Sequence, residues 1–161
     1  MKKIILILIS LMISSVLVLC AKASNTDTYL SWEMQKACIK HGEEYGICPE
    51  LLMAIIEQES RGQPDAENEG CKGLMQINEK FHIDRMNRLG VTDIYSVDGN
   101  IRVGADYLLE LFEEYGEIYL VLMVYNMGSE RAEALWEQGK ISKYALTVAE
   151  RSAELERLHG K

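Results

Sequence analysis

The segment Ile118–Tyr125 constrains the fold most, because it is apolar on nearly every side. A helix without a polar face is stable only when other elements cover it all round. Gly116 precedes the segment and Gly128 follows it, which fits a helix that starts and stops at these glycines. The sequence therefore predicts one helix at the centre of the fold.

The rest of the chain shows helical periodicity and no alternating strand pattern of any length. Pro49 stands where a helix favours proline, and Asp98 or Asn100 is the expected cap of the longest helix. A polar loop is expected over residues 60–72, before a short apolar patch at residues 73–78. Further helices are expected at residues 30–44, 49–59, 81–89, from 98 or 100 to 115, 129–138 and 142–158. Their predicted buried side chains include Ile101, Ala105, Leu108, Leu109 and Phe112, then Tyr144, Ala145, Val148, Leu155 and Leu158. The fold class predicted is all-α, a single compact helical domain with little or no strand.

The first 23 residues have the layout of a secretory signal peptide. Two lysines precede the apolar run Ile4–Leu19, and Ala21–Ala23 supplies small residues for cleavage after Ala23. The domain then covers residues 24–161. The sequence leaves two other outcomes open: an uncleaved anchor through residues 4–20, and lipidation at Cys20, although Leu19 is large for that motif. All three place the domain outside the cytoplasm, in the cell wall, the extracellular space or the periplasm.

The charge of the chain argues against nucleic acid as a partner. The formal net charge is −8, and loss of the three lysines in residues 1–23 makes it −11. An acidic surface repels phosphate backbones, so the binding of an anionic polymer must depend on a cleft of complementary shape. We expect a monomer.

Three cysteines remain after residue 23, namely Cys38, Cys48 and Cys71. An exported protein can form a disulfide, and a bridge between Cys48 and Cys71 and a buried free thiol are both open. The histidines and cysteines do not cluster at metal-ligand spacing, so we predict neither a metal nor a cofactor.

Glu59 is the candidate catalytic residue. On a helix over residues 49–59, Leu52, Ile55 and Ile56 lie within about 60° of Glu59, while Glu57 points about 160° away, towards solvent. Glu59 therefore continues the apolar stripe. Desolvation raises the pKa of a carboxyl group, which lets it hold a proton near neutral pH and act as a general acid. The simpler interpretation is a glutamate paired with lysine or arginine.

Two further motifs place amides or a phenol at the ends of buried elements. Gly73-Leu74-Met75-Gln76-Ile77-Asn78 reads by itself as a turn that enters the core. Tyr125-Asn126-Met127-Gly128 reads by itself as a helix stop. Amides and phenols also suit the hydroxyl and N-acetyl groups of sugars.

In this order, Glu59-Ser60, Gly73–Asn78 and Tyr125–Gly128 resemble the catalytic domain of the soluble lytic transglycosylases, glycoside hydrolase family 23, related to goose-type lysozyme. The resemblance covers roughly residues 40–150. It implies a fold of the α+β lysozyme-like superfamily with a glycan-binding cleft. Further positions that fit the family's spacing are Asn100-Ile101, Gly104, Tyr107-Leu108 and Tyr144.

The resemblance also implies residue roles. Glu59 would be the sole catalytic carboxylate, Gln76 would line the cleft, and Tyr125 would lie near the glutamate and the sugar. Ser60 and Asn126 fall at positions that hold the site's shape. The substrate-binding set implied is Gln76, Tyr125, Ser60, Met75, Asn126 and Tyr144.

The implied reaction cleaves the β-1,4 bond between N-acetylmuramic acid and N-acetylglucosamine in peptidoglycan and leaves a 1,6-anhydro end. Hydrolysis would require a second carboxylate. The candidates are Asp65, Glu67 and Glu69, for which a solvated loop face is the expected interpretation. A wall-binding or assembly scaffold without turnover is the other alternative. Cys71, Lys72 and Glu79 depart from the family's pattern and are expected to alter the cleft shape.

Overall fold

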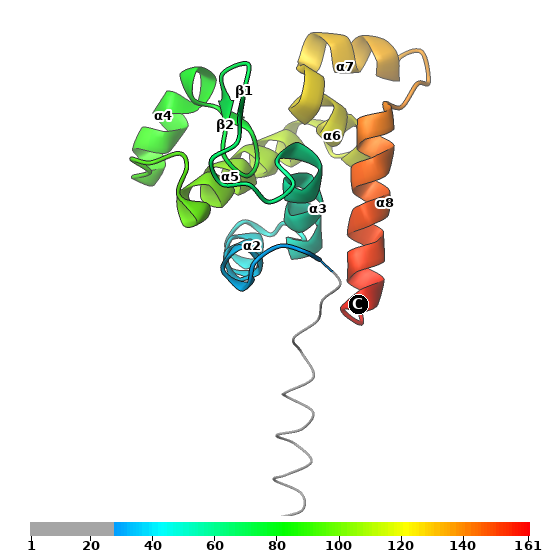
Figure 1. The fold of residues 1–161 in the computed structure, drawn as a ribbon. Helices are drawn as coiled ribbons and strands as arrows, with labels where there is room; N and C mark the ends of the chain where they lie inside the picture. The colour runs from blue at the N-terminus through cyan, green and yellow to red at the C-terminus, as the bar shows by residue number, and fades with distance from the viewer. Residues whose placement is uncertain (1–27) are drawn as a thin grey trace, which may run out of the picture.

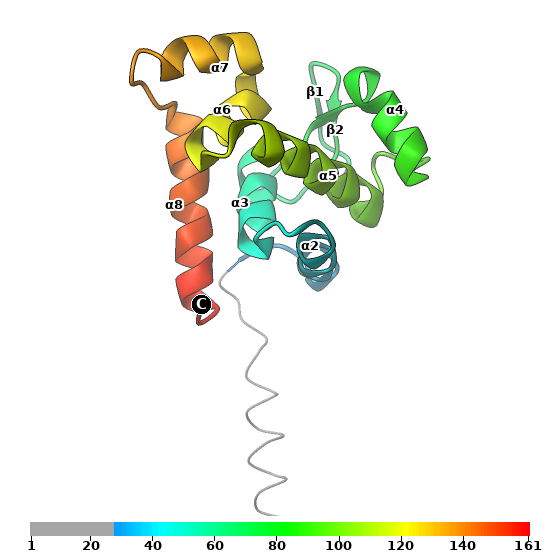
Figure 2. The ribbon, with the colours of Figure 1, turned by 180° about the vertical axis from the view of Figure 1, so that it is seen from behind.

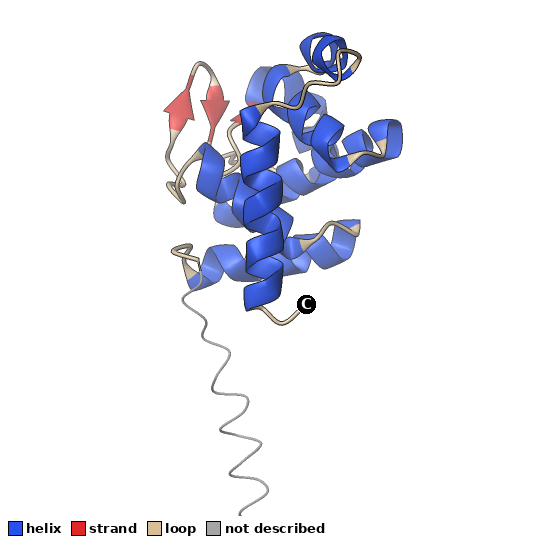
Figure 3. Ribbon diagram, turned by 90° about the vertical axis from the view of Figure 1, so that its right-hand side faces the viewer, coloured by secondary structure: helices blue, strands red, loops and turns tan. Residues whose placement is uncertain are grey.

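The computed structural model describes residues 28–161, so the predicted signal peptide, anchor and lipidation site lie outside the described residues. The described chain is a helical domain with a small sheet at one edge, as Figures 1, 2 and 3 show from three sides. Its helices are α2 (Trp32–Tyr45), α3 (Pro49–Glu59), α4 (Glu79–Leu89), α5 (Val97–Tyr115), α6 (Ile118–Met127), α7 (Ser129–Trp136) and α8 (Lys143–Leu158). The strands are β1 (Glu67–Asn68), β2 (Cys71–Lys72) and β3 (Ile77–Asn78). The predicted helical fold class is confirmed.

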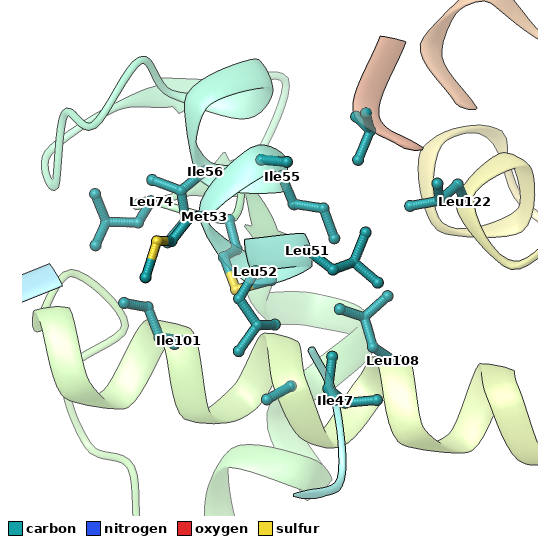
Figure 4. Close-up of a cluster of buried hydrophobic side chains, with 14 of the residues drawn as sticks. Ile47, Leu51, Leu52, Met53, Ile55, Ile56, Leu74, Ile101, Leu108 and Leu122 are labelled. Atoms are coloured by element: carbon teal, nitrogen blue, oxygen red, sulfur yellow. The ribbon is translucent and has the colours of Figure 1, made fainter. Parts of the chain in front are cut away.

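Helix α3 lies in the middle of the molecule, with α8 on one side and α4, beyond the small sheet, on the other (Figures 1 and 2). It packs against α8 and α2, and α2 also packs against α5. Every residue from Glu50 to Ile56 is buried, and Figure 4 shows α3 side chains near Ile101 and Leu108 of α5. The burial predicted for residues 118–125 is confirmed for residues 120–124 of α6, but the helix in the middle of the molecule is α3.

The polar loop predicted over residues 60–72 contains part of a three-stranded antiparallel sheet. Glu67 pairs with Lys72 and Cys71 pairs with Asn78. Glu69 and Gly70 both have positive φ, as a two-residue hairpin turn requires. This sheet fixes the chain that leads from the end of α3 to residues 73–78.

The cap of α5 was predicted wrongly. Ser96 is the N-cap, and both Asp98 and Asn100 lie inside the helix. Asn100 is completely buried, and its side-chain amide forms hydrogen bonds with three backbone groups outside the helix. A preference for asparagine at caps says nothing about such distant partners.

Some predicted core positions were also wrong. Leu158 is 45% exposed because α8 ends at the rim of an open pocket beside α2 and α3. Leu109 and Phe112 are half-buried, whereas Leu111 is buried. Glu57 does not point into solvent: its side chain is 9% exposed and pairs with Arg151 of α8 at 2.7 Å. Periodicity within one helix does not reveal which neighbour will cover its second face.

Cys38, Cys48 and Cys71 are free thiols, so the described chain has no bridge between Cys48 and Cys71. Within residues 28–161, no helix combines the length and the apolar character needed to cross a membrane.

Candidate active site

Glu59 is the last residue of α3, at the point where the buried face of the helix meets the turn before the sheet. Its side chain is half-buried, and Oε1 accepts a hydrogen bond of 2.6 Å from the Tyr144 hydroxyl. Burial raises the pKa of Glu59, and the hydrogen bond from Tyr144 lowers it by less. Among the described residues no lysine, arginine or histidine forms an ion pair with this carboxylate. The paired-glutamate interpretation therefore does not apply to the described chain.

Tyr144 reaches Glu59 from α8, which lies 85 residues further along the chain. The start of α8 is fixed by Ser142, whose hydroxyl accepts from the Ala145 amide at 3.1 Å. Burial and the charge of Glu59 hold the pKa of Tyr144 well above its ordinary value. The phenol therefore stays protonated and donates a hydrogen bond to the carboxylate.

Ser60 caps the end of α3 and is 6% exposed. Its hydroxyl donates to the Ile56 carbonyl and accepts from the Gly62 amide, both at 3.2 Å. Arg61 and Gly62 follow with positive φ, which turns the chain sharply. In this structure Ser60 forms the turn beside Glu59.

The segment 73–78 is tied to α5 and α6 through its backbone. The Met75 amide donates to Asn100 Oδ1 at 2.7 Å, and the Met75 carbonyl accepts from the Tyr125 hydroxyl at 2.8 Å. The Met75 side chain is completely buried, and its sulfur fills the space that a side chain on Gly104 would need. Met75 is thus a core residue whose backbone positions the segment.

Gln76 has a φ of 48°, in the left-handed region that few non-glycine residues adopt. Its Nε2 donates to the carbonyls of Gly73 and Ala66, at 3.0 and 3.2 Å. These bonds hold the side-chain amide at the pocket wall, where Oε1 is left as the acceptor for a ligand.

Tyr125 is half-buried and stacks on Tyr107, with 5.5 Å between the ring centroids. Burial and the nearby charge of Glu59 hold the pKa of Tyr125 well above its ordinary value. Asn126, the next residue, is exposed and is not part of the pocket wall that contains Tyr125.

A pocket of about 340 Å³ extends from this region to α4. Glu59 does not itself line this pocket, but its charge raises the pKa of two of the wall residues, Cys71 and Tyr125. The wall consists of Cys71, Gln76, Ile77, Asn78, Phe81, His82, Tyr107, Val124, Tyr125 and Gly128. A larger pocket, of about 550 Å³, lies beside Trp32, Pro49 and Leu158, and none of the predicted site residues lines it.

Sequence reasoning did not assign Asn78, Phe81 or His82 to the site. Asn78 belongs to the amide-containing motif of residues 73–78, and the signal for Phe81 was an aromatic residue in the polar first turn of a helix, which is common without function. The acidic candidates Asp65, Glu67 and Glu69 are exposed, and Glu67 accepts from the Tyr95 hydroxyl at 2.8 Å. Residues 28–161 contain no group of three histidine, cysteine or acidic side chains arranged to hold a metal.

Comparison with known proteins identifies similar sequences and folds. The model of the family described as Transglycosylase SLT domain matches residues 36–146. The chain is 32% identical over 90 residues to the transglycosylase of Enterobacteria phage PRD1, covering 55% of this chain and 32% of that protein. It is 31% identical over 103 residues to the membrane-bound lytic murein transglycosylase F of Desulfosudis oleivorans, covering 59% of this chain and 21% of that protein. The chain thus spans a third or less of these two relatives.

The fold matches a solved structure, an inactive mutant of the lytic transglycosylase Slt from Pseudomonas aeruginosa, with a TM-score of 0.68. The two sequences are 20% identical, and the match covers 77% of this chain and 24% of that one. At this identity the match concerns the fold alone.

Proposed function

Because this chain belongs to the Transglycosylase SLT domain family, we propose that it is a peptidoglycan lytic transglycosylase in which Glu59 is the single catalytic acid and base. The observation that carries the proposal is the burial of Glu59 and the contacts of its carboxyl group. It is a half-buried carboxyl group without a cationic partner in the described chain, held by a phenol beside a pocket of amides and aromatic rings. A carboxylic acid whose pKa is raised by burial can remain protonated until a substrate needs the proton.

The proposed bond is the β-1,4 linkage between N-acetylmuramic acid and N-acetylglucosamine. Protonated Glu59 gives its proton to the bridging oxygen as the bond from that oxygen to C1 breaks. The N-acetyl carbonyl of the muramic residue stabilises the positive charge at C1. Ionised Glu59 then takes the proton of the 6-hydroxyl as O6 bonds to C1 and closes the 1,6-anhydro ring. Glu59 ends protonated, and no water is consumed.

One carboxylate suffices for this sequence of steps, since the nucleophile belongs to the substrate. Hydrolysis by a retaining or inverting route uses two carboxylates. The exposure of Asp65, Glu67 and Glu69 supports the one-carboxylate route, because a solvated carboxylate is a poor candidate for a positioned base.

Tyr144 is proposed to orient the carboxylate through its hydrogen bond, and Gln76 Oε1 to accept from a sugar hydroxyl or N-acetyl N–H. Tyr125 supplies a ring at the pocket wall near Glu59. Ser60, Met75 and Asn100 set the positions of these groups through the backbone.

With peptidoglycan as the substrate, the reaction takes place outside the cytoplasm. The signal-like segment over residues 1–23 would direct the domain there. We propose export, with anchoring through residues 4–20 as the alternative to cleavage.

Mass spectrometry of digested peptidoglycan tests the reaction. The purified protein is expected to release muropeptides that are lighter by one water than hydrolysed ones. Glu59→Gln keeps the shape, removes the proton, and is expected to lower the rate by at least about 10²-fold. Combined replacement of Asp65, Glu67 and Glu69 by their amides is the matched control and should leave rate and product unchanged.

Other outcomes would separate the alternatives. Reducing ends in place of anhydro ends would indicate a muramidase, and their loss in the triple variant would identify the second carboxylate. Unchanged cellular function of Glu59→Gln would favour a wall-binding scaffold.

A further inference from the structure

Among residues 28–161, Phe81 is the most exposed of the large hydrophobic side chains, with 76% of its surface accessible, yet it lines the same pocket as Gln76 and Tyr125. An exposed apolar residue is ordinary by itself. Its position distinguishes this one, because it stands where the pocket reaches α4, and Asn78 and His82 belong to the same wall.

Helix α4 is attached to α5 by charged residues one and two turns beyond Phe81. Met86 is the one buried residue of α4. Arg85 and Arg88 both bind Asp106 of α5, and the side chains of Arg85 and Asp106 are 10% and 9% exposed. Buried charges that pair well resist displacement. The helix is therefore attached firmly, and Phe81 can stay exposed at the pocket rim.

The next residue extends the aromatic surface towards the catalytic end. His82 lies against Tyr107, with 4.5 Å between ring centroids, and Tyr107 lies 5.5 Å from Tyr125. Arg85 covers Tyr107 at 5.2 Å. Aromatic rings thus continue from Tyr125, near Glu59, to His82 beside Phe81.

The charge of the pocket indicates which ligand it can take. None of the residues lining it is aspartate, glutamate, lysine or arginine. At its edge Lys72 is neutralised by Glu79 at 2.7 Å. Burial lowers the pKa of His82, which favours the neutral imidazole. An uncharged ligand with one apolar face and several hydroxyls fits such a wall better than the carboxylates of muramic acid or of a peptide stem.

We propose that Phe81 and His82, together with Asn78, form a subsite for an uncharged N-acetylglucosamine ring of the glycan, separate from the bond that is cut. The proposal rests on the proposed function. The axial C–H bonds of the sugar meet the negative face of the Phe81 ring, while the His82 imidazole and the Asn78 amide bond its hydroxyls. This subsite touches no reacting atom, and we expect it to bind the sugar equally in the ground state and the transition state, so that its loss raises KM and leaves kcat unchanged.

Binding without turnover tests the subsite directly. A chitin tetrasaccharide, which contains only uncharged N-acetylglucosamine, is titrated into the Glu59→Gln protein by calorimetry. Adding Phe81→Ala is expected to weaken binding roughly three- to tenfold, the range of a lost aromatic contact. Phe81→Trp should restore the affinity. The matched control is Ile83→Ala, which removes an exposed apolar side chain of the same helix outside the pocket.

Kinetics with soluble peptidoglycan strands provide a second measurement. In the protein with Glu59 intact, Phe81→Ala should raise KM by a similar factor and leave kcat within about twofold. Equal affinities of Phe81→Ala and Ile83→Ala for the tetrasaccharide, or no binding by the Glu59→Gln protein itself, would overturn the subsite. Full activity of Glu59→Gln would instead overturn the proposed function, so the two failures are distinguishable.

Discussion

Two opposing effects act on the pKa of Glu59, and one of them comes from a residue 85 positions away in the sequence. Burial raises the pKa of the carboxyl group, and the Tyr144 hydroxyl partly offsets the rise by stabilising the ionised form. The first effect provides a proton donor. The second makes the proton easier to release and fixes the direction of the carboxylate.

Tyr144→Phe separates these effects. Removing the hydroxyl takes away a donor that favours the anion, so the pKa of Glu59 should rise further. A general acid must be protonated, and activity is lost as pH rises through its pKa. The alkaline limb of the profile of kcat/KM against pH should therefore move to higher pH in the variant. An unchanged limb, or one moved to lower pH, would show that the hydrogen bond does not control the proton. Tyr115→Phe, a phenol that bonds Glu133, is the control and should not move the limb.

The sequence predicted the orientation of Glu59 but not its contacts. The helical period predicted that Glu59 faces inward, and its side chain is half-buried, although residues 50–56 are buried on every side of α3 and not along one stripe. The same argument failed for Glu57, whose face of α3 is covered by α8. No local pattern relates Tyr144 to Glu59 across 85 residues, and the assignment of Tyr144 came from the family resemblance.

Among the elements, α5 shows how a single buried amide can position a loop. Asn100 accepts from the Met75 amide at 2.7 Å and donates to the carbonyls of Ile94 and Lys72 at 2.8 and 3.0 Å. Gly73 passes so close that an added Cβ would lie 2.3 Å from the Asn100 nitrogen. The segment with Gln76 therefore depends on the fit between Gly73 and Asn100.

Asn100→Leu should destabilise the fold by about 2–4 kcal/mol, because it leaves buried backbone groups without partners at similar side-chain volume. Urea denaturation measures the change in the free energy of unfolding. Asn87→Leu, at an exposed position of α4, should stay within about 0.5 kcal/mol of the parent. If Asn100→Leu lowers the free energy of unfolding no more than the control does, Asn100 does not hold the segment as described.

Helices were predicted well and strands were not, for a physical reason. The helix over residues 49–59 was predicted with its observed bounds, since Pro49 and the apolar repeat specify it locally. Strands of two residues are too short to show alternation, and their pairing depends on the turn at Glu69 and Gly70. The N-cap of α5 was misassigned because Asn100 serves the loop and not the helix end.

In the molecule as a whole, the candidate site forms where distant elements converge: the end of α3, the start of α8, the segment 73–78 and α6. The pocket then extends to α4. Helix α4 and helix α8 lie on opposite sides of α3 (Figures 1 and 2). Sequence motifs identified the parts of this site that lie near Glu59. The α4 end could not be predicted, because exposure and pocket position are properties of the assembled fold.

The other end of α3 is fastened to the residues that follow α8. Glu50 is 2% exposed and accepts hydrogen bonds of 2.8 Å from both His159 Nδ1 and Lys161 Nζ. Burial alone would raise the pKa of Glu50, but hydrogen bonds from Lys161, His159 and Cys48 outweigh it and lower the pKa to about 2. Tyr144 with Glu59 and His159 with Glu50 therefore join opposite ends of α3 and α8, and the pair of Arg151 with Glu57 lies between them.

A carboxyl group whose pKa falls on folding stabilises the folded state above its ordinary pKa of 4.5, and the contribution is lost as pH falls from there towards 2. The double variant His159→Ala/Lys161→Ala leaves the buried Glu50 carboxylate without these donors and should lose about 2–3 kcal/mol at pH 7. Urea denaturation at a series of pH values should show this difference from the parent shrinking below pH 4.5. Adding Glu50→Gln should recover part of the loss at pH 7, since an amide costs less to bury than an unpaired charge. Lys143→Ala, which removes an exposed lysine at the other end of α8, is the control. A stability difference that does not change with pH would mean that these residues act by packing and not through the charge of Glu50.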